Sequence, residues 1–193
     1  MSKVAITGNA SGTGVFTVAS PNSNVDRVLT LPDETGTVDT LQRSGNVVQV
    51  VNFQTGAVAT GTTVIPYDDT IPQITEGTEF MTLAITPTNA NNILLISVVA
   101  NLNLSAGARR IVALFKDASA DALAASIDYG AGGGEDGLLN IEYRAVSGST
   151  NEMTFKVRAG LNLAGTTTFN GNGGARYLGG TQFSSITITE LTP

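Results

Sequence analysis

The chain has 193 residues, a formal net charge of -6, and neither cysteine nor histidine. Without these residue types it can form no disulfide, thiolate metal site or histidine base, and its acidic balance disfavours nucleic acid, whose phosphates need a positive surface. A hydrophobic content of 41% still allows one sizeable core. No apolar run approaches the roughly 20 residues of a membrane span, and the first residues lack the apolar centre of a signal peptide, so we expect a soluble protein made in a cytoplasm.

The first 45 residues differ in sequence pattern from the rest of the chain. They contain short alternating segments separated by Asn, Pro and Gly, which cannot bury a core of their own. Turn residues at Ser44, Gly45 and Asn46 then mark a boundary. We therefore predict an N-terminal attachment segment over residues 1–45, rich in β structure and dependent on a partner, followed by a head domain over residues 46–193.

Glycines near the start of this segment imitate a dinucleotide-binding motif. Gly8, Gly12 and Gly14 follow a short apolar run at the spacing of short-chain dehydrogenases, where glycines let the backbone approach a pyrophosphate. That motif requires a helix after the glycines, but the residues after Gly14 alternate like a strand and reach Pro21. The sequence therefore disfavours a nicotinamide-dependent enzyme.

The head is predicted to be all-β, because 22 glycines and many Thr, Asn and Val residues accompany no long helical pattern. Residues 138–145 and 153–159 are expected to pair as a hairpin, with the apolar residues from Met153 to Ala159 facing inward and Thr154, Lys156 and Arg158 facing outward. Residues 122–129 are interpreted as either a strand or a short helix. Further strands are expected at residues 46–53, 80–85, 92–104, 110–116 and 183–190. Eight to ten strands at this spacing are typical of a β-sandwich or jelly roll.

The most continuously apolar run, residues 92–104, is predicted to be the central strand. Alternate side chains of a strand point to opposite faces. Apolar residues occupy both faces here: Leu94, Ile96 and Val98 line one, and Ile93, Leu95 and Val99 the other. Because few helices are available to cover a second face, we expect it to meet another copy of the chain. A strand buried wholly inside one subunit is the alternative.

Part of the N-terminal segment resembles a known family. The sequences FTVASPN (16–22), DRVLTLPD (26–33) and TGTV (35–38) are similar to a short pattern that recurs in tail-fibre and related appendage proteins of tailed bacteriophages. There the pattern commonly precedes a receptor-binding head and attaches or braces a trimeric fibre. The resemblance implies that residues 1–45 attach the protein to a virion.

The order of strands in the head is similar to the trimeric jelly-roll heads of the complement and tumour-necrosis-factor type. In those trimers the last strand lies near the subunit interface. The resemblance implies a homotrimer with these interface residues: Leu94, Ile96, Val98, Phe183, Ile186 and Ile188. The aromatic content of 6% departs from such heads, which often place aromatic residues along the three-fold axis.

Acidic pairs are the only candidates for catalysis. Asp68 and Asp69, or Glu135 and Asp136, could be taken for the two carboxyls of a glycosidase. Successive residues of an extended chain point in opposite directions, however, so neither pair supplies that geometry alone. We expect no enzymatic activity, no cofactor and no metal. A calcium site in the loop 128–136 is the weaker alternative to a solvated loop.

Ligand recognition is the remaining class of function. Binding residues usually lie in loops at one end of a rigid sandwich. Two glycine-rich loops carry rings for stacking and polar groups for hydroxyls. The candidate ligand-binding residues are Tyr129, Glu135, Asp136, Asn170, Asn172, Arg176 and Tyr177.

Together these patterns predict a bacteriophage virion structural protein, a tail fibre or receptor-binding appendage that recognises the host surface. The alternative is a capsid decoration or head-fibre protein that binds no receptor. The predicted location is the virion, and the predicted partners are other copies of the chain, the baseplate, tail or capsid proteins, and a host-surface glycan. Nucleic acid and membrane insertion are not expected.

Overall fold

The computed structural model describes residues 11–13, 17, 24–26, 28 and 44–193. The predicted attachment segment, its phage-like pattern and the dehydrogenase-like glycines lie largely outside the described residues. Within them, the first strand begins at Val47 and is preceded by a turn at residues 44 and 45. The boundary at residue 45 stays a prediction.

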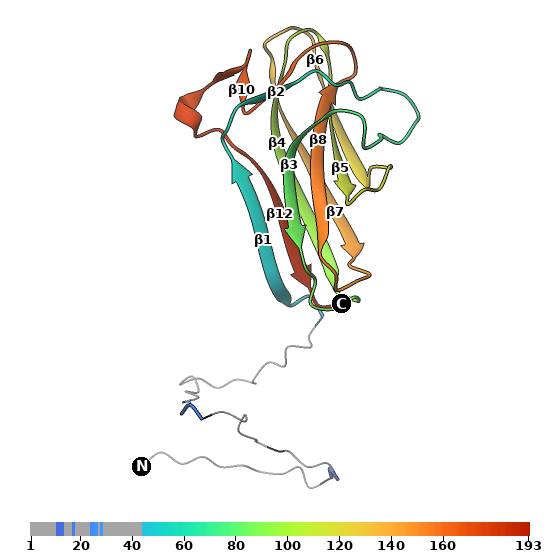
Figure 1. Cartoon of the computed structure of the whole chain (residues 1–193), viewed down its shortest axis with the longest axis vertical. Coiled ribbons are helices and arrows are strands. Elements are labelled where there is room, and N and C mark those ends of the chain that lie inside the picture. Colours follow the sequence, from blue (N-terminus) through green and yellow to red (C-terminus); the bar gives the residue numbers. More distant parts are fainter. Residues whose placement is uncertain (1–10, 14–16, 18–23, 27, 29–43) are drawn as a thin grey trace. The chain divides into compact units, whose positions relative to one another are not determined.

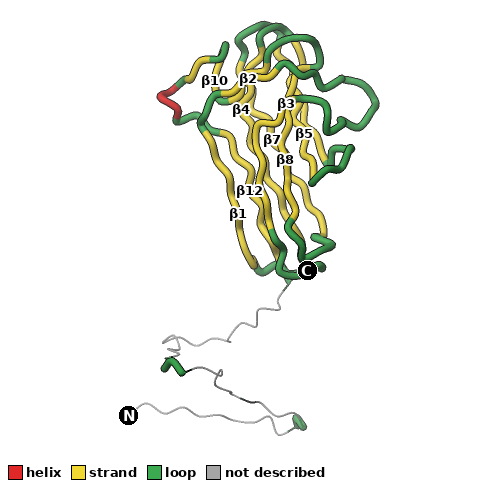
Figure 2. The backbone as a smooth tube through the Cα atoms, viewed as in Figure 1, coloured by secondary structure: helices red, strands yellow, loops and turns green. Residues whose placement is uncertain are grey.

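The head is all-β, as predicted (Figures 1 and 2). Of residues 122–129, which the sequence left open between strand and helix, the part from Ala124 onward belongs to a strand, Ala124–Gly130. A single 3-10 turn, η1 (Leu178–Gly180), is the only helical element of the described residues. The strands are β1 (Val47–Thr55), β2 (Ala59–Gly61), β3 (Thr78–Ile85), β4 (Ile93–Leu104), β5 (Ala108–Lys116), β6 (Ala124–Gly130), β7 (Asp136–Val146), β8 (Met153–Leu161), β9 (Thr167–Phe169), β10 (Gly171–Asn172), β11 (Ala175–Arg176) and β12 (Ser184–Leu191).

Two antiparallel sheets face each other in a jelly-roll sandwich. The first, called the β4 sheet, has the order β1-β12-β4-β7, with β9 and β2 continuing beyond the end of β12 alongside the upper part of β4. The second, called the β8 sheet, has the order β3-β8-β5-β6. Most neighbours in each sheet are far apart in sequence, which is the mark of Greek-key winding.

One predicted pairing is wrong. β7 pairs with β4 in one sheet, whereas β8 pairs with β3 and β5 in the other, so residues 138–145 and 153–159 form no hairpin. The connection between them crosses from sheet to sheet. Alternation predicts that each segment is a strand with one buried face, and a sandwich lets successive strands bury that face from opposite sides.

The core fills the space between the sheets and is built by alternating side chains. In β8 the residues Met153, Phe155, Val157 and Ala159 are buried and the intervening ones are not, as predicted. In β4 the buried face is Leu94, Ile96 and Val98. Each such side chain contributes about 1.5–3 kcal/mol by leaving water.

The interface prediction needs correction for five of its six residues. Leu94, Ile96, Val98, Ile186 and Ile188 are at most 1% exposed within one chain, so they have no surface left for a partner. They form the core because β12 lies beside β4 with Ile186 opposite Val98 and Ile188 opposite Ile96. The sixth residue, Phe183, is half-exposed just before β12. The opposite face of β4, with Ile93, Leu95 and Val99, is only partly buried.

A long segment of residues 62–77, here called the strap, lies over the outside of the β8 sheet. Ile65 donates its backbone N–H to Leu161 O at 3.0 Å, and the Arg158 guanidinium donates to the carbonyls of Glu76 and Gly77. Behind it, Phe115 is buried although it points away from the sandwich core. The strap therefore covers much of one outer face and leaves the β4 sheet uncovered.

The two faces of β4 make a direct prediction about adjacent residues. Ile96→Asp should prevent folding, because an unpaired charge in the core costs several kcal/mol of a total stability of about 5–15 kcal/mol. Leu95→Asp, one residue away on the outer face, should fold. Circular dichroism during thermal unfolding measures both. Equal melting temperatures for the two variants would show that the faces are assigned wrongly.

Candidate functional site

The two glycine-rich loops meet at one end of the sandwich, as the sequence-based site requires. The Asn172 side chain donates to Gly134 O at 2.6 Å, and Asn103 donates to the Asp136 carboxylate at 3.0 Å. A cavity of about 390 Å³ lies between them. Its lining residues are Thr60, Asn103, Leu104, Ser105, Gly134, Thr166, Thr168, Asn172, Gly173 and Gly174.

Most candidate side chains in these loops brace the loops themselves. The Glu135 carboxylate accepts from the backbone N–H groups of Ala131 and Gly132, at 3.0 and 2.8 Å. Asn170 is buried, donates to the carbonyls of Thr55 and Ala57, and accepts from the Ser184 hydroxyl. These side chains already form hydrogen bonds within the protein, so a ligand could bind them only by breaking those bonds.

A buried arginine anchors the glycine-rich loop 128–136, here called the first loop. Arg110 points inward from β5, pairs with the Asp128 carboxylate and donates to Glu135 O at 2.7 Å. Its Nε is buried with no hydrogen-bond partner among the described residues. Gly137 is required beside it, because a Cβ there would lie 2.5 Å from the Arg110 Cζ. The pair holds the loop closed over the end of the core.

The remaining candidates do not join one site. Arg176 and Tyr177 are exposed where β11 ends, close to Gly180 rather than to the first loop. Tyr129 lies on β6, on the outer face of the β8 sheet, where it is 60% exposed. There the Arg109 guanidinium lies over two rings, 4.2 Å from the Tyr67 centroid and 5.5 Å from the Tyr129 centroid.

Sequence reasoning missed Arg109 and Tyr67. Arg109 lies directly opposite Tyr129 in the β5–β6 pairing, a register that no local pattern specified. Tyr67 is contributed by the strap, where Pro66 and Pro72 interrupt any regular pattern. A cation close to two tyrosines, with the three residues on separate segments, becomes visible only once the strands are paired.

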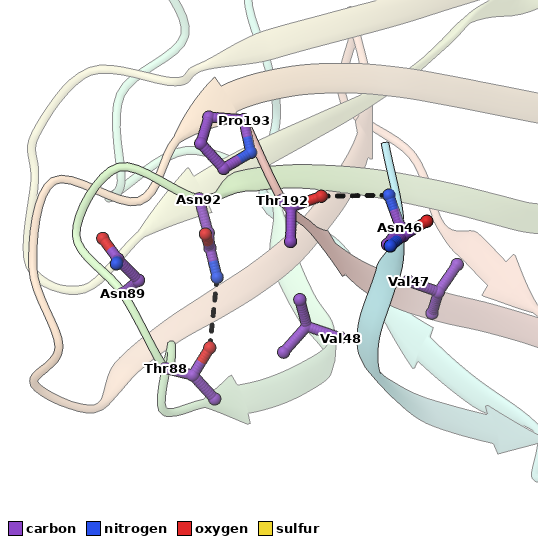
Figure 3. Close-up of a pocket in the computed structure, with 8 residues that line it drawn as sticks. All are labelled: Asn46, Val47, Val48, Thr88, Asn89, Asn92, Thr192 and Pro193. Atoms are coloured by element: carbon purple, nitrogen blue, oxygen red, sulfur yellow. Dashed lines mark hydrogen bonds between the residues drawn. The ribbon is translucent and has the colours of Figure 1, made fainter. Parts of the chain in front are cut away.

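The opposite end of the sandwich holds a cavity of about 680 Å³ next to the C-terminus (Figure 3). Asn46 donates its backbone N–H to the Thr192 hydroxyl at 3.0 Å, and Asn92 donates to the Thr88 hydroxyl at 3.1 Å. The cavity is lined by Asn46, Val47, Val48, Thr88, Asn89, Asn92, Thr192 and Pro193. Its lining offers amides, hydroxyls and methyl groups but no charged side chain.

A buried carboxylate fastens this end. Glu190 is fully buried and accepts from the side chains of Gln49 at 2.5 Å and Asn92 at 2.6 Å, and from both the N–H and the hydroxyl of Thr88. Burial alone would raise the pKa of Glu190, but the hydrogen bonds from Gln49, Asn92 and Thr88 together lower the pKa below its ordinary value of 4.5. Glu190 therefore stays ionised and ties β1, β12 and the turn before β4 together.

The described residues contain neither a metal cluster nor a membrane-spanning helix. The described part of the chain holds no cluster of three or more acidic side chains placed to bind a metal ion. It also holds no helix with the length and apolar character of a membrane span. The carboxylates at both ends act as acceptors for the protein's own N–H and O–H groups.

Comparisons with known proteins assign the fold to a family. The model of the family described as the Pgp3 C-terminal domain matches residues 51–193. No curated protein matches the chain. Among solved structures, dimeric latent PorU from Porphyromonas gingivalis is similar over 77% of this chain at 11% identity and a TM-score of 0.34, with 14% of PorU covered.

Two viral structures are similar at the same low level. Infectious bursal disease virus, Gx strain, is 12% identical over 86% of this chain and 44% of that chain, with a TM-score of 0.35. The enzymatically active domain of tailspike protein 4 of bacteriophage CBA120 is 14% identical over 65% and 19%, with a TM-score of 0.25. The chain spans less than half the length of each of these three structures, and similarity at such scores supports no inference about function.

Glu190 predicts how stability responds to acid. Because its folded pKa lies below the unfolded value, its stabilisation is complete above pH 4.5 and is lost as pH falls through the folded pKa. Glu190→Gln should lower the free energy of unfolding at pH 7 by about 1–3 kcal/mol, because an amide N–H₂ would face donors that need acceptors.

Urea unfolding of both proteins between pH 3 and pH 7 measures the difference. We expect the gap between wild type and Glu190→Gln to narrow as the solution becomes more acidic. A gap that stays constant over this range would mean that folding does not lower the pKa of Glu190.

Proposed function

Because the chain belongs to the Pgp3 C-terminal domain family, a domain of a chlamydial plasmid protein, we propose that its head is a non-catalytic binding domain that assembles as a homotrimer. The family is one of trimeric, tumour-necrosis-factor-like domains. The strand orders β1-β12-β4-β7 and β3-β8-β5-β6 give this chain the same kind of sandwich.

The family also corrects the origin predicted from the N-terminal residues. Residues 51–193 match a bacterial plasmid-protein domain, so the predictions of a phage tail fibre and of a capsid decoration protein were both wrong. The virion location and the baseplate, tail and capsid partners are wrong for the same reason. A short pattern ahead of a domain identifies neither that domain nor its setting.

The outer face of the β4 sheet is the observation that carries the trimer. Ile93, Leu95 and Val99 point away from the core and are only partly covered by their neighbours. Leu191 of β12 and Val146 of β7 lie directly opposite Ile93 on either side, which gives an apolar row across three strands. Such a contiguous apolar face on a soluble domain favours a protein partner.

Other copies of the chain suit the apolar row of the β4 sheet better than an unrelated partner does. The strap covers the outside of the β8 sheet, so the β4 sheet is the face left for assembly. Polar residues frame the apolar row: Ser97 donates to the Glu142 carboxylate at 2.5 Å, and Thr187 accepts from Asn52 at 2.8 Å. An apolar centre with a polar surround is the usual anatomy of an interface, and a heterologous contact that closes after three copies forms a ring.

The absence of catalysis is proposed from the chemistry available. The chain has no histidine or cysteine, and Glu135, Asp136 and Glu190 serve as acceptors for internal hydrogen bonds. A general base needs a free lone pair near a substrate proton. Binding, which needs only a shaped surface, suits this scaffold better.

Assembly can be tested at one position. Leu95→Asp should convert the trimer into a folded monomer of 19.8 kDa, because a charge at the centre of an apolar contact costs several kcal/mol. Light scattering coupled to gel filtration measures the mass. Ala84→Asp, on the exposed outer face of the β8 sheet, is the matched control and should remain trimeric. A wild-type protein that is monomeric at micromolar concentration would overturn the proposal.

A further inference from the structure

We propose that Tyr67, Arg109 and Tyr129 form a binding site for the carboxylate of an acidic sugar residue. The three side chains come from the strap, β5 and β6 and meet on the outer face of the β8 sheet. Both rings are well exposed, at 59% for Tyr67 and 60% for Tyr129. The site lies away from the proposed trimer face, so assembly would leave it open.

The Arg109 guanidinium lies over two tyrosine rings. Its Cζ is 4.2 Å from the Tyr67 centroid and 5.5 Å from the Tyr129 centroid, distances at which a cation is attracted to an aromatic ring. Within the described residues, the guanidinium makes no hydrogen bond and no ion pair, whereas Arg110 and Arg158 both do. A stacked guanidinium keeps its in-plane N–H donors available, and a carboxylate accepts two of them at once.

The backbone holds this cation in place before any ligand arrives. Arg109 donates its N–H to the Asn162 side chain at 2.7 Å, and its carbonyl accepts from Asn162 N at 3.0 Å. Tyr129 is likewise fixed, because its N–H donates to the Asp128 carboxylate at 2.7 Å and Asp128 is paired with Arg110. A site ordered in advance loses less freedom on binding.

A shallow groove lies along the strap residues that follow Tyr67. It has a volume of about 290 Å³, and Asp68, the residue after Tyr67, is part of its lining. The Thr70 hydroxyl and then the Thr70 N–H lower the pKa of Asp68, so its carboxylate stays charged and its second oxygen is free to accept. The lining is Asp68, Asp69, Thr70, Ile71, Pro72, Ala122, Ala124 and Ala125.

This combination favours a hydroxyl-rich ligand that carries a single carboxylate. The Asp68 and Asp69 carboxylates accept hydrogen bonds from sugar hydroxyls, and the exposed tyrosine rings stack on a pyranose. The same carboxylates repel polyphosphates and densely sulfated chains, as does the net charge of -6. An acidic sugar residue, such as a sialic or uronic acid at the end of an oligosaccharide, matches each of these groups.

Titration calorimetry on the full chain tests the site. The probes are an oligosaccharide that ends in sialic acid, one that ends in glucuronic acid, and the same two molecules with the carboxylate reduced to an alcohol. We expect at least one acidic probe to bind, and its reduced form to bind about 10- to 100-fold more weakly, as expected for the loss of a charge-assisted hydrogen bond.

Three variants locate the binding. Arg109→Ala should abolish the preference for the acidic form, and Tyr67→Ala should weaken both forms. Lys156→Ala removes a cation from the same outer face but outside the cluster, and should bind like wild type. Light scattering on each variant separates this result from the assembly proposal, because all three should keep the mass of the wild type.

Several results would overturn the site. One is equal binding of the acidic and reduced forms, and another is unchanged selectivity in Arg109→Ala. A third is no binding of either acidic probe by a wild-type protein that circular dichroism shows to be folded. Binding that is lost equally in Lys156→Ala would also count against it, because it would indicate attraction by general charge.

Discussion

The structure depends on a single strand having two different faces. β4 is hydrogen-bonded along one side to β7 and along the other to β12 and then β9, so its backbone is satisfied throughout. Its inner face, at Ile96, meets the β8 sheet and closes the core. Its outer face carries Ile93, Leu95 and Val99 among polar residues, and these three side chains are only partly buried within the chain. The same alternation that makes the fold stable therefore creates the surface on which a trimer can form.

Each end of the sandwich is stabilised by one buried charged residue, Glu190 at one end and Arg110 at the other. Glu190 closes the end near the C-terminus with hydrogen bonds alone, and Arg110 closes the loop end through Asp128 and a carbonyl. A buried charge without partners would cost several kcal/mol, so each needs its surrounding loops in one position. The loops in turn are built from Asn, Thr and Gly, residues that supply these partners and turn sharply. The charges thus specify loop positions more than they add stability.

Sequence patterns predicted the strands and their inward residues well, and the partners of those strands poorly. In β8 the alternation from Met153 to Ala159 was sufficient, because period two alone identifies a buried face. In β4 both faces were apolar, and alternation could not tell which one would meet the second sheet. Leu94, Ile96 and Val98 were therefore assigned to the interface although they form the core. Tyr129 was predicted as a binding residue of a glycine-rich loop and lies instead on β6, and the positions of Arg109 and Tyr67 depend on register and on the strap.

The two proposals place assembly and recognition on different sheets. On the outer face of the β8 sheet the strap accepts hydrogen bonds from Arg158, and Phe115 is buried. The strap also brings Tyr67 over Arg109, which gives the covered sheet a polar and aromatic surface instead. The uncovered β4 sheet retains the apolar row around Ile93. A trimer closed by the β4 sheets would direct three β8 sheets outward, so weak binding of one sugar at each would combine into a much stronger attachment to a surface that displays many.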